Sequence, residues 1–266
     1  QLVREQDRDR FLLSFFAPPE SREALWALFA FNYEIAKTRE VVSEMQLGLI
    51  RLQWWREAIG RIYDTGAVPE HEVLQPLAAA IKAHDLPREY FETMIYAREF
   101  DLEDVLPGNM EGLINYADFT NTPLLKLAVK ITGGDPEAEP VQPVAVNYAL
   151  AGILRAVPFH AAQRRCLLPE DLMQAQGIRL THLYDLKPPE NLPKVVELLA
   201  AKGAKIEVWN KKNKYRWSPI TITEGYRLGN FKPSPDTLAA LHKVLRDAGI
   251  DPPPPTVPEV EKGYSD

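Results

Sequence analysis

The chain has little sulfur and no long apolar run. It contains one cysteine, Cys166, among its 266 residues, so no internal disulfide framework can form and a reducing compartment is expected. No run of apolar residues approaches the roughly 18 that a membrane-spanning helix needs. The net charge of −6 lacks the basic excess that is typical of nucleic-acid-binding proteins. These absences favour a globular protein that is held together by a hydrophobic core.

The alternation of apolar and polar residues that marks a half-buried strand is also missing from the first 178 residues. Helical spacing is present instead: between residues 47 and 63, apolar side chains recur at Leu49, Leu52, Trp55, Ile59 and Ile62. The same spacing, with proline and glycine as boundaries, predicts further helices over residues 24–35, 77–84, 87–100, 111–119, 122–131 and 143–155. Because 45% of the residues are hydrophobic, the core can be substantial, and we predict an all-α bundle.

The composition changes after residue 178, and a proline-rich stretch at residues 183–191 marks a boundary. Residues 180–250 resemble ankyrin repeats, because residues 195–204 match the V-V-x-L-L…G-A pattern and residues 217–220 match the turn that opens a repeat. About three repeats are needed for a stable stack, whereas fewer than two complete ones are visible. We therefore predict a helical domain at residues 1–178, an ankyrin-like helical segment at 179–250 that packs against it or is poorly ordered, and a proline-rich disordered tail at 251–266.

Two segments of the helical domain carry most of the functional information. Residues 29–40 read FAFNYEIAKTRE, and residues 154–172 read LRAVPFHAAQRRCLLPEDL. They resemble the two signatures of the squalene/phytoene synthase family, Y-A-F-C-R-x-x-D-D-x-x-D and N-x-L-R-D-V-x-E-D…R-x-Y-L-P. The second frame fits without a gap at Leu154, Arg155, Val157, Arg165, Leu168 and Pro169. The resemblance covers roughly residues 5–178 and implies an isoprenoid-synthase-like helical bundle. That bundle is truncated if the ankyrin-like segment replaces its last helices.

The positions that hold metal-binding acids in that family carry mostly other residues here. They are Ala36, Lys37 and Glu40 in the first segment and Ala156 and His160 in the second, and Gly152 stands at the asparagine position of the second metal motif. The family's reaction expels diphosphate, and Mg²⁺, which prefers carboxylate oxygens, neutralises its charge. Only Glu40 remains acidic, and Lys37 lies close to it. We therefore predict no metal site, no cofactor and no catalytic residue. Mg²⁺ is expected as a cofactor only if the chain is an active prenyl transferase.

Five cationic residues lie in or near the two signature segments: Lys37, Arg39, Arg155, Arg164 and Arg165. Such side chains can bind a prenyl diphosphate or a lipid headgroup directly, without magnesium. Alternatively, they are solvated or paired with the neighbouring glutamates Glu34, Glu40 and Glu170. Both interpretations stay open on the sequence alone.

Several other residues have ordinary structural explanations. His160 is expected to be a polar helix-end residue, because no metal-ligand cluster accompanies it in sequence. Cys166 is expected to be a buried thiol. One ring of the Trp54–Trp55 pair should face the core, and the other the surface or a partner. A solvated helix end is the interpretation of the acidic run formed by Glu99, Asp101, Glu103 and Asp104.

The segments at 31–40, 54–59, 97–133 and 154–171 resemble one branch of the family in particular, whose members act in the assembly of respiratory complex I. This implies a non-catalytic assembly factor with complex I subunits or assembly proteins as partners. It also implies a location in the mitochondrial matrix or, in a bacterium, either in the cytoplasm or peripherally on the inner face of the inner membrane. The alternatives are an active prenyl transferase of the squalene/phytoene synthase type and an ankyrin-type protein-interaction module.

Overall fold

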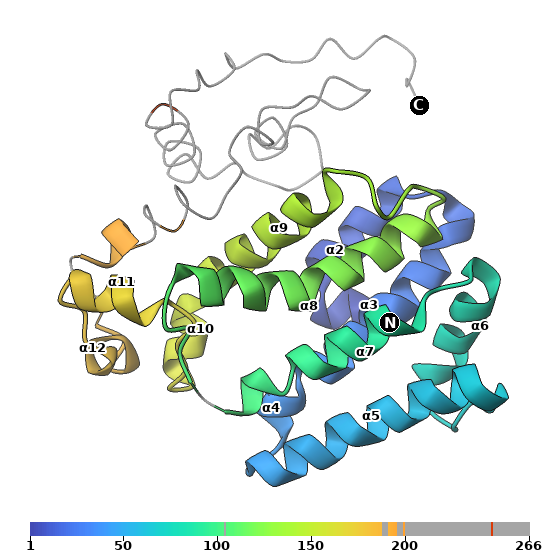
Figure 1. Cartoon of the computed structure of the whole chain (residues 1–266), viewed down its shortest axis with the longest axis horizontal. Helices are drawn as coiled ribbons and strands as arrows, with labels where there is room; N and C mark the ends of the chain where they lie inside the picture. The colour runs from blue at the N-terminus through green and yellow to red at the C-terminus, as the bar shows by residue number, and fades with distance from the viewer. Residues whose placement is uncertain (104, 188–190, 196–198, 200–245, 247–266) are drawn as a thin grey trace. The chain divides into compact units, whose positions relative to one another are not determined.

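The computed structural model of the chain describes residues 1–103, 105–187, 191–195, 199 and 246. The chain divides into two compact units, residues 1–189 and 190–266, and the fold described below is that of the first. Every regular element among the described residues is helical, which confirms the all-α prediction (Figure 1). The α-helices are α1 (Leu2–Gln6), α2 (Arg8–Leu13), α3 (Arg22–Ala36), α4 (Thr38–Val41), α5 (Met45–Thr65), α6 (Leu74–His84), α7 (Arg88–Ala97), α8 (Met110–Ile131), α9 (Val141–Arg155), α10 (Val157–Ala162), α11 (Glu170–Ala175) and α12 (Leu180–Tyr184). Short 3₁₀ turns lie at η1 (Ser14–Phe16), η2 (Pro19–Ser21) and η3 (Phe100–Leu102).

Three aromatic rings fasten α3, α5 and α7 together in the core. The centroid of the Phe31 ring lies 5.5 Å from that of Trp55 and 5.4 Å from that of Phe91, both edge to face. All three side chains are fully buried, so this cluster contributes both buried area and specific ring geometry. Trp54, the preceding residue, is 42% exposed, as expected if one ring of the pair faces the core and the other the surface, although the two ring centroids lie only 5.0 Å apart.

The helix α8 packs against both α7 and α9, and it is longer than the sequence predicts. Two helices were expected, at residues 111–119 and 122–131, because a proline usually ends a helix. The structure instead has one helix of 22 residues with Pro123 inside it. Pro123 is buried, and packing along both neighbouring helices outweighs the loss of one backbone hydrogen bond. The predicted start of α6 at residue 77 was also late, since Pro76 lies in the first turn, where its missing N–H costs little.

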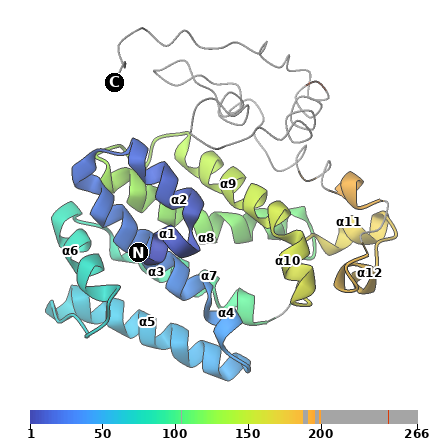
Figure 2. The same ribbon diagram turned by 180° about the vertical axis from the view of Figure 1, so that it is seen from behind.

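The second signature segment contains a helix break. The helix α9 ends at Arg155, and α10 begins at Val157 with Pro158 in its first turn. Pro158 lacks the backbone N–H that a helix continuing through this segment would use, which favours a break here. The chain then continues to α11 and α12 (Figure 2). Between α10 and α11, Cys166 is buried with its Sγ atom 3.8 Å from the Met173 Sδ atom. Burial raises the pKa of the Cys166 thiol, as expected for a structural cysteine.

The predicted ankyrin-like segment begins at α12, and nearly all of it lies outside the described residues, as does the predicted tail at 251–266. In the part of the chain that the structure describes, no helix has the length and apolar character to cross a membrane.

Candidate functional site

An open cleft of about 350 Å³ brings the two signature segments together. Its walls come from α1 to α4 on one side and from α8 to α10 on the other, with the end of α7 and η3 behind them. Ala36 and Glu40 line it from the first segment. Gly152, Ala156 and His160 line it from the second. Five of the six positions that belong to the family's metal motifs therefore face one cavity, although the break at Ala156 separates the last of them from α9.

Lys37, the sixth position, does not line the cleft. Its Nζ atom lies 2.6 Å from a carboxylate oxygen of Glu34, and the other oxygen of that carboxylate accepts a hydrogen bond from Arg51 at 2.8 Å. Glu34 itself is buried, so the pair holds Lys37 against the protein.

The donor set of the cleft does not fit magnesium. Among the residues that the structure describes, no three His, Cys, Asp or Glu side chains are grouped in a way that could hold a metal ion. The carboxylates that line the cleft belong to Asp7, Glu40 and Asp101. Asp7 is paired with Arg10 at 2.6 Å, and Asp101 is paired with two arginines. Of these three described carboxylates, only that of Glu40 is therefore available to bind a cation.

The back of the cleft is formed by a buried cluster of charges around Asp101. Its carboxylate accepts hydrogen bonds from the Tyr116 hydroxyl at 2.8 Å, from Arg165 at 3.2 Å and from Arg98 at 3.3 Å. Arg98 also donates to the side-chain oxygen of Asn32 at 3.4 Å. Two guanidinium groups thus share one carboxylate. Burial, reinforced by the charge of Asp101, raises the pKa of Tyr116, which stays a neutral donor.

The interpretation of the acidic run as a solvated helix end was therefore wrong for Asp101, whose side chain is only 6% exposed. The η3 turn directs this residue inward, where the arginines compensate its charge. Glu103 is exposed as predicted, and Glu99 pairs with Arg56 at 2.6 Å. Asp104 lies outside the described residues.

His160 lies on α10 and is half-buried. Burial and the nearby positive charge of Arg165 lower the pKa of its imidazole, against a weaker opposing effect of Asp101. Its Nδ1 atom is buried without a hydrogen-bond partner in the protein. The side chain is therefore a neutral polar group that faces the cleft with one unused nitrogen.

Two of the five candidate anion-binding residues line the cleft. Arg165 is held at its back by Asp101. Arg155 lies at its edge, where its side chain is 74% exposed and pairs with Asp9 at 2.6 Å. Arg39 does not line the cleft, and Arg164 borders a separate small cavity beside Phe100. Sequence reasoning missed Arg98 and Arg10; the spacing of Arg98 and Asp101 by three residues was the only signal for the former.

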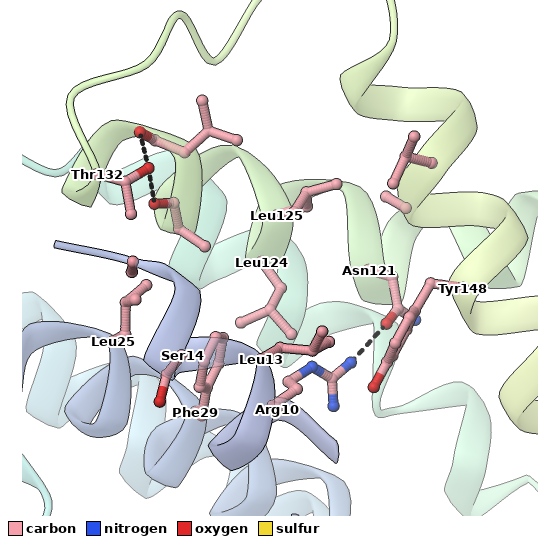
Figure 3. A pocket seen from close by; sticks show the side chains of 15 residues that line it. Arg10, Leu13, Ser14, Leu25, Phe29, Asn121, Leu124, Leu125, Thr132 and Tyr148 are labelled. Carbon is pink, nitrogen blue, oxygen red and sulfur yellow. Dashed lines mark hydrogen bonds between the residues drawn. The ribbon is translucent and has the colours of Figure 1, made fainter. Parts of the chain in front are cut away.

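A second cavity, of about 320 Å³, adjoins the cleft and is almost wholly apolar. It lies between α2, η1, α3, α8 and α9 (Figure 3). Arg10, Asn121 and Tyr148 line both cavities. The Arg10 guanidinium donates to the Asn121 side-chain oxygen at 3.0 Å and lies 4.9 Å from the centroid of the Tyr148 ring. This contact between α2, α8 and α9 is the boundary between a polar cleft and an apolar pocket.

A helical bundle in which two signature segments meet across one cleft defines the isoprenoid-synthase-like class of proteins. The sequence model of the squalene/phytoene synthase family matches residues 3–206, and the chain belongs to this family. Two solved structures have the same fold. A squalene synthase, HpnC, from Alicyclobacillus acidocaldarius superposes with a TM-score of 0.67 at 17% identity, covering 94% of this chain and 92% of that one. A dehydrosqualene synthase gives a TM-score of 0.64 at 18% identity, covering 76% and 70%.

Curated relatives include both assembly factors and enzymes. The chain is 32% identical over 205 residues to NADH dehydrogenase (ubiquinone) complex I, assembly factor 6, from Bos taurus, and 31% identical to the protein of that name from Homo sapiens. Each match covers 76% of this chain and 61% of the relative. A presqualene diphosphate synthase from Sinorhizobium fredii is 24% identical over 189 residues, covering 70% and 67%. The predicted likeness to ankyrin repeats finds no support in these comparisons.

Proposed function

We propose that this chain is a non-catalytic member of the squalene/phytoene synthase family that acts in the assembly of respiratory complex I. The observation that carries the proposal is the cleft, which brings the two signature segments together while Ala36, Ala156 and His160 stand where the family has acids. Relatives at about 30% identity are named as complex I assembly factors, which supports this function. Complex I subunits or other assembly proteins are the proposed partners. The proposed location is the mitochondrial matrix, or the inner face of the inner membrane in a bacterium.

The test is genetic complementation in a host that has complex I. Deleting the gene should lower the amount of assembled complex I on native gels and reduce NADH-dependent respiration. Re-expressing the full-length gene should restore both. Normal complex I in the deletion strain would overturn the proposal.

The alternative, an active prenyl transferase, requires the diphosphate to leave with its charge neutralised. Because Asp7 and Asp101 are engaged by arginines, the cleft does not offer the carboxylates for this. Incubation with radiolabelled farnesyl or geranylgeranyl diphosphate and Mg²⁺ should therefore give no squalene- or phytoene-like product. A labelled product would establish catalysis.

A second function, compatible with the first, is metal-independent binding of a prenyl diphosphate or a lipid phosphate in the cleft. The Asp101 cluster motivates it, because two arginines share one carboxylate and the Nε atom of Arg98 is buried without a partner. Titration calorimetry with farnesyl diphosphate in EDTA tests it. Arg165→Gln should weaken binding about tenfold or more, because a hydrogen bond to a charged group is lost. The matched control is Arg164→Gln, an exposed arginine outside the cleft that should leave the affinity unchanged. Absence of wild-type binding removes this function.

A further inference from the structure

Exposed apolar side chains gather at the end of α2 and in η1, next in sequence to residues that line the apolar pocket. Leu12, Leu13, Phe15 and Phe16, at the end of α2 and in η1, are between 39% and 66% exposed. Val144 on α9 is 40% exposed and, like Leu13, also lines the pocket. We call these five residues the apolar rim. So many large apolar side chains in one place on a protein surface usually mark an interaction site.

Hydrogen bonds fix the backbone of the rim, so that its side chains are held outward. The buried Ser14 hydroxyl donates to the Phe11 carbonyl at 2.6 Å and accepts from the Trp26 indole at 2.8 Å. Arg22 donates to the carbonyls of Phe15 and Ala17 at 3.0 and 3.2 Å. The exposure of the rim is therefore built into the fold and does not result from a loose chain end.

The Phe15 side chain shows how the rim is supported from behind. Its ring packs edge to face on Phe11 at 5.1 Å and on Trp26 at 6.4 Å between centroids. The Arg22 guanidinium lies 5.4 Å from the centroid of the same ring. Phe16 makes none of these ring contacts and is the most exposed of the five, at 66%. The segment therefore presents apolar side chains on a rigid aromatic base.

The chemistry of the surroundings favours a lipid bilayer as the occupant. Behind the rim lies a pocket of about 320 Å³ that is apolar around Leu13, Leu124 and Leu125 and has polar side chains such as Arg10 and Asn121 at its edge (Figure 3). Flexible hydrocarbon chains can fill such a hollow. Trp26 and Arg22, at the base of the rim, are residue types that lie well at the level of lipid headgroups.

Electrostatics contribute little to this surface. The cations Arg8 and Arg22 flank the rim in sequence, but the exposed Glu20 and Glu23 offset them. Docking must therefore depend mainly on apolar burial, and binding should change little between neutral and anionic vesicles.

We propose that the apolar rim is the surface by which this protein docks on a lipid bilayer, with the mouth of the apolar pocket facing the acyl chains. The proposal does not rest on a role in complex I assembly, nor on ligand binding in the cleft.

The test is flotation of the full chain with phosphatidylcholine vesicles. Leu12→Glu combined with Phe16→Glu places two charges on the rim at exposed side chains that contribute little to the core. This variant should lower the partition coefficient for vesicles about tenfold or more. The matched control is Leu47→Glu combined with Ile50→Glu, which changes two exposed apolar residues on α5. The helix α5 lies at the opposite edge of the bundle from α2 (Figure 1 and Figure 2). The control variant should bind as the wild type does, and thermal unfolding should show that both variants are folded.

Three outcomes overturn the proposal. Wild-type protein that does not float with vesicles removes it, and so does a rim variant that binds as well as the wild type. Equal loss of binding in the α5 variant shows that the docking surface is not specific to the rim. If the wild type fails to float but is a dimer that the rim variant dissociates, the rim is an interface between copies of this chain, and the lipid proposal is wrong.

Discussion

The polar cleft and the apolar pocket meet at Arg10, Asn121 and Tyr148. The two cavities differ in how far the side chains that line them also belong to the core of the bundle. In the cleft, the signature positions Ala36 and Ala156 lie on the cavity surface and are only half-buried. A change there alters chemistry without disturbing the core. The pocket, by contrast, is partly formed by buried core residues such as Leu25, Phe29 and Leu124, so that part of its shape cannot be separated from the packing of the bundle.

Asp101 is the exception within the cleft. It faces the cavity, but its carboxylate also joins η3, α7, α8 and the segment after α10 through Arg98, Tyr116 and Arg165. The comparison teaches that residues at metal-ligand positions on a cavity wall can be replaced at little cost in free energy of unfolding, whereas residues of a buried charge cluster behind them cannot. Changes at these two kinds of position should differ sharply in free energy of unfolding.

The largest effect is expected for Asp101→Ala. It leaves the guanidinium groups of Arg98 and Arg165 buried without their shared carboxylate, which should cost about 3–5 kcal/mol of unfolding free energy. The control is Asp9→Ala, which breaks an exposed pair with Arg155 and should cost about 0–1 kcal/mol. Urea unfolding followed by circular dichroism measures both. Similar losses in the two variants would contradict a structural role for the cluster.

The contrast between the two cavities also shows what sequence alone can predict. Helical spacing located most of the helices, because apolar periodicity directly reflects burial. The structure brings Ala36, Gly152, Ala156 and His160, which the signature motifs singled out, together around one cleft. The burial of Asp101 escaped prediction, because its partners Arg165 and Tyr116 are distant in sequence and only the fold brings them together. For the same reason, the sequence around Arg10 did not predict that this residue lies between the two cavities.

A pair of leucines on α8 tests whether the pocket wall is less tightly packed than the core. Leu124 lines the pocket, whereas Leu127, one turn later, is fully buried elsewhere. Leu127→Ala should cost about 4 kcal/mol, and Leu124→Ala about 2 kcal/mol, because the side chain beside an existing hollow loses fewer contacts. Urea unfolding of the two variants gives the difference. Equal costs would mean that the pocket is closed in solution.

Restoring acids to the cleft tests whether the chain lacks only the metal-binding carboxylates and still has a geometry that suits magnesium. Ala36→Asp combined with Ala156→Asp adds two carboxylates to the cavity that Glu40 already lines. Millimolar Mg²⁺ should then stabilise the variant by about 1 kcal/mol, seen as a rise in melting temperature, while the wild type shows no change. The control variant Ala36→Asn with Ala156→Asn has similar volume without charge and should not respond. No response in the aspartate variant would show that the cleft no longer has a geometry that suits magnesium.

The smallest effect concerns the pH dependence that His160 contributes. Its pKa is lowered in the folded protein, first by burial and then by the charge of Arg165, so the unfolded chain binds a proton at a higher pH than the folded chain does. Stability from this group is therefore fully present above the ordinary histidine pKa and is lost as the pH falls through that value toward the folded one. Asp101 opposes the shift only weakly. In urea unfolding at about pH 7.5 and pH 5.5, wild-type stability should fall more steeply than that of His160→Gln, which cannot titrate in this range. Parallel behaviour of the two proteins would show that the imidazole reaches solvent freely and that the back of the cleft is wetter than its buried contacts indicate.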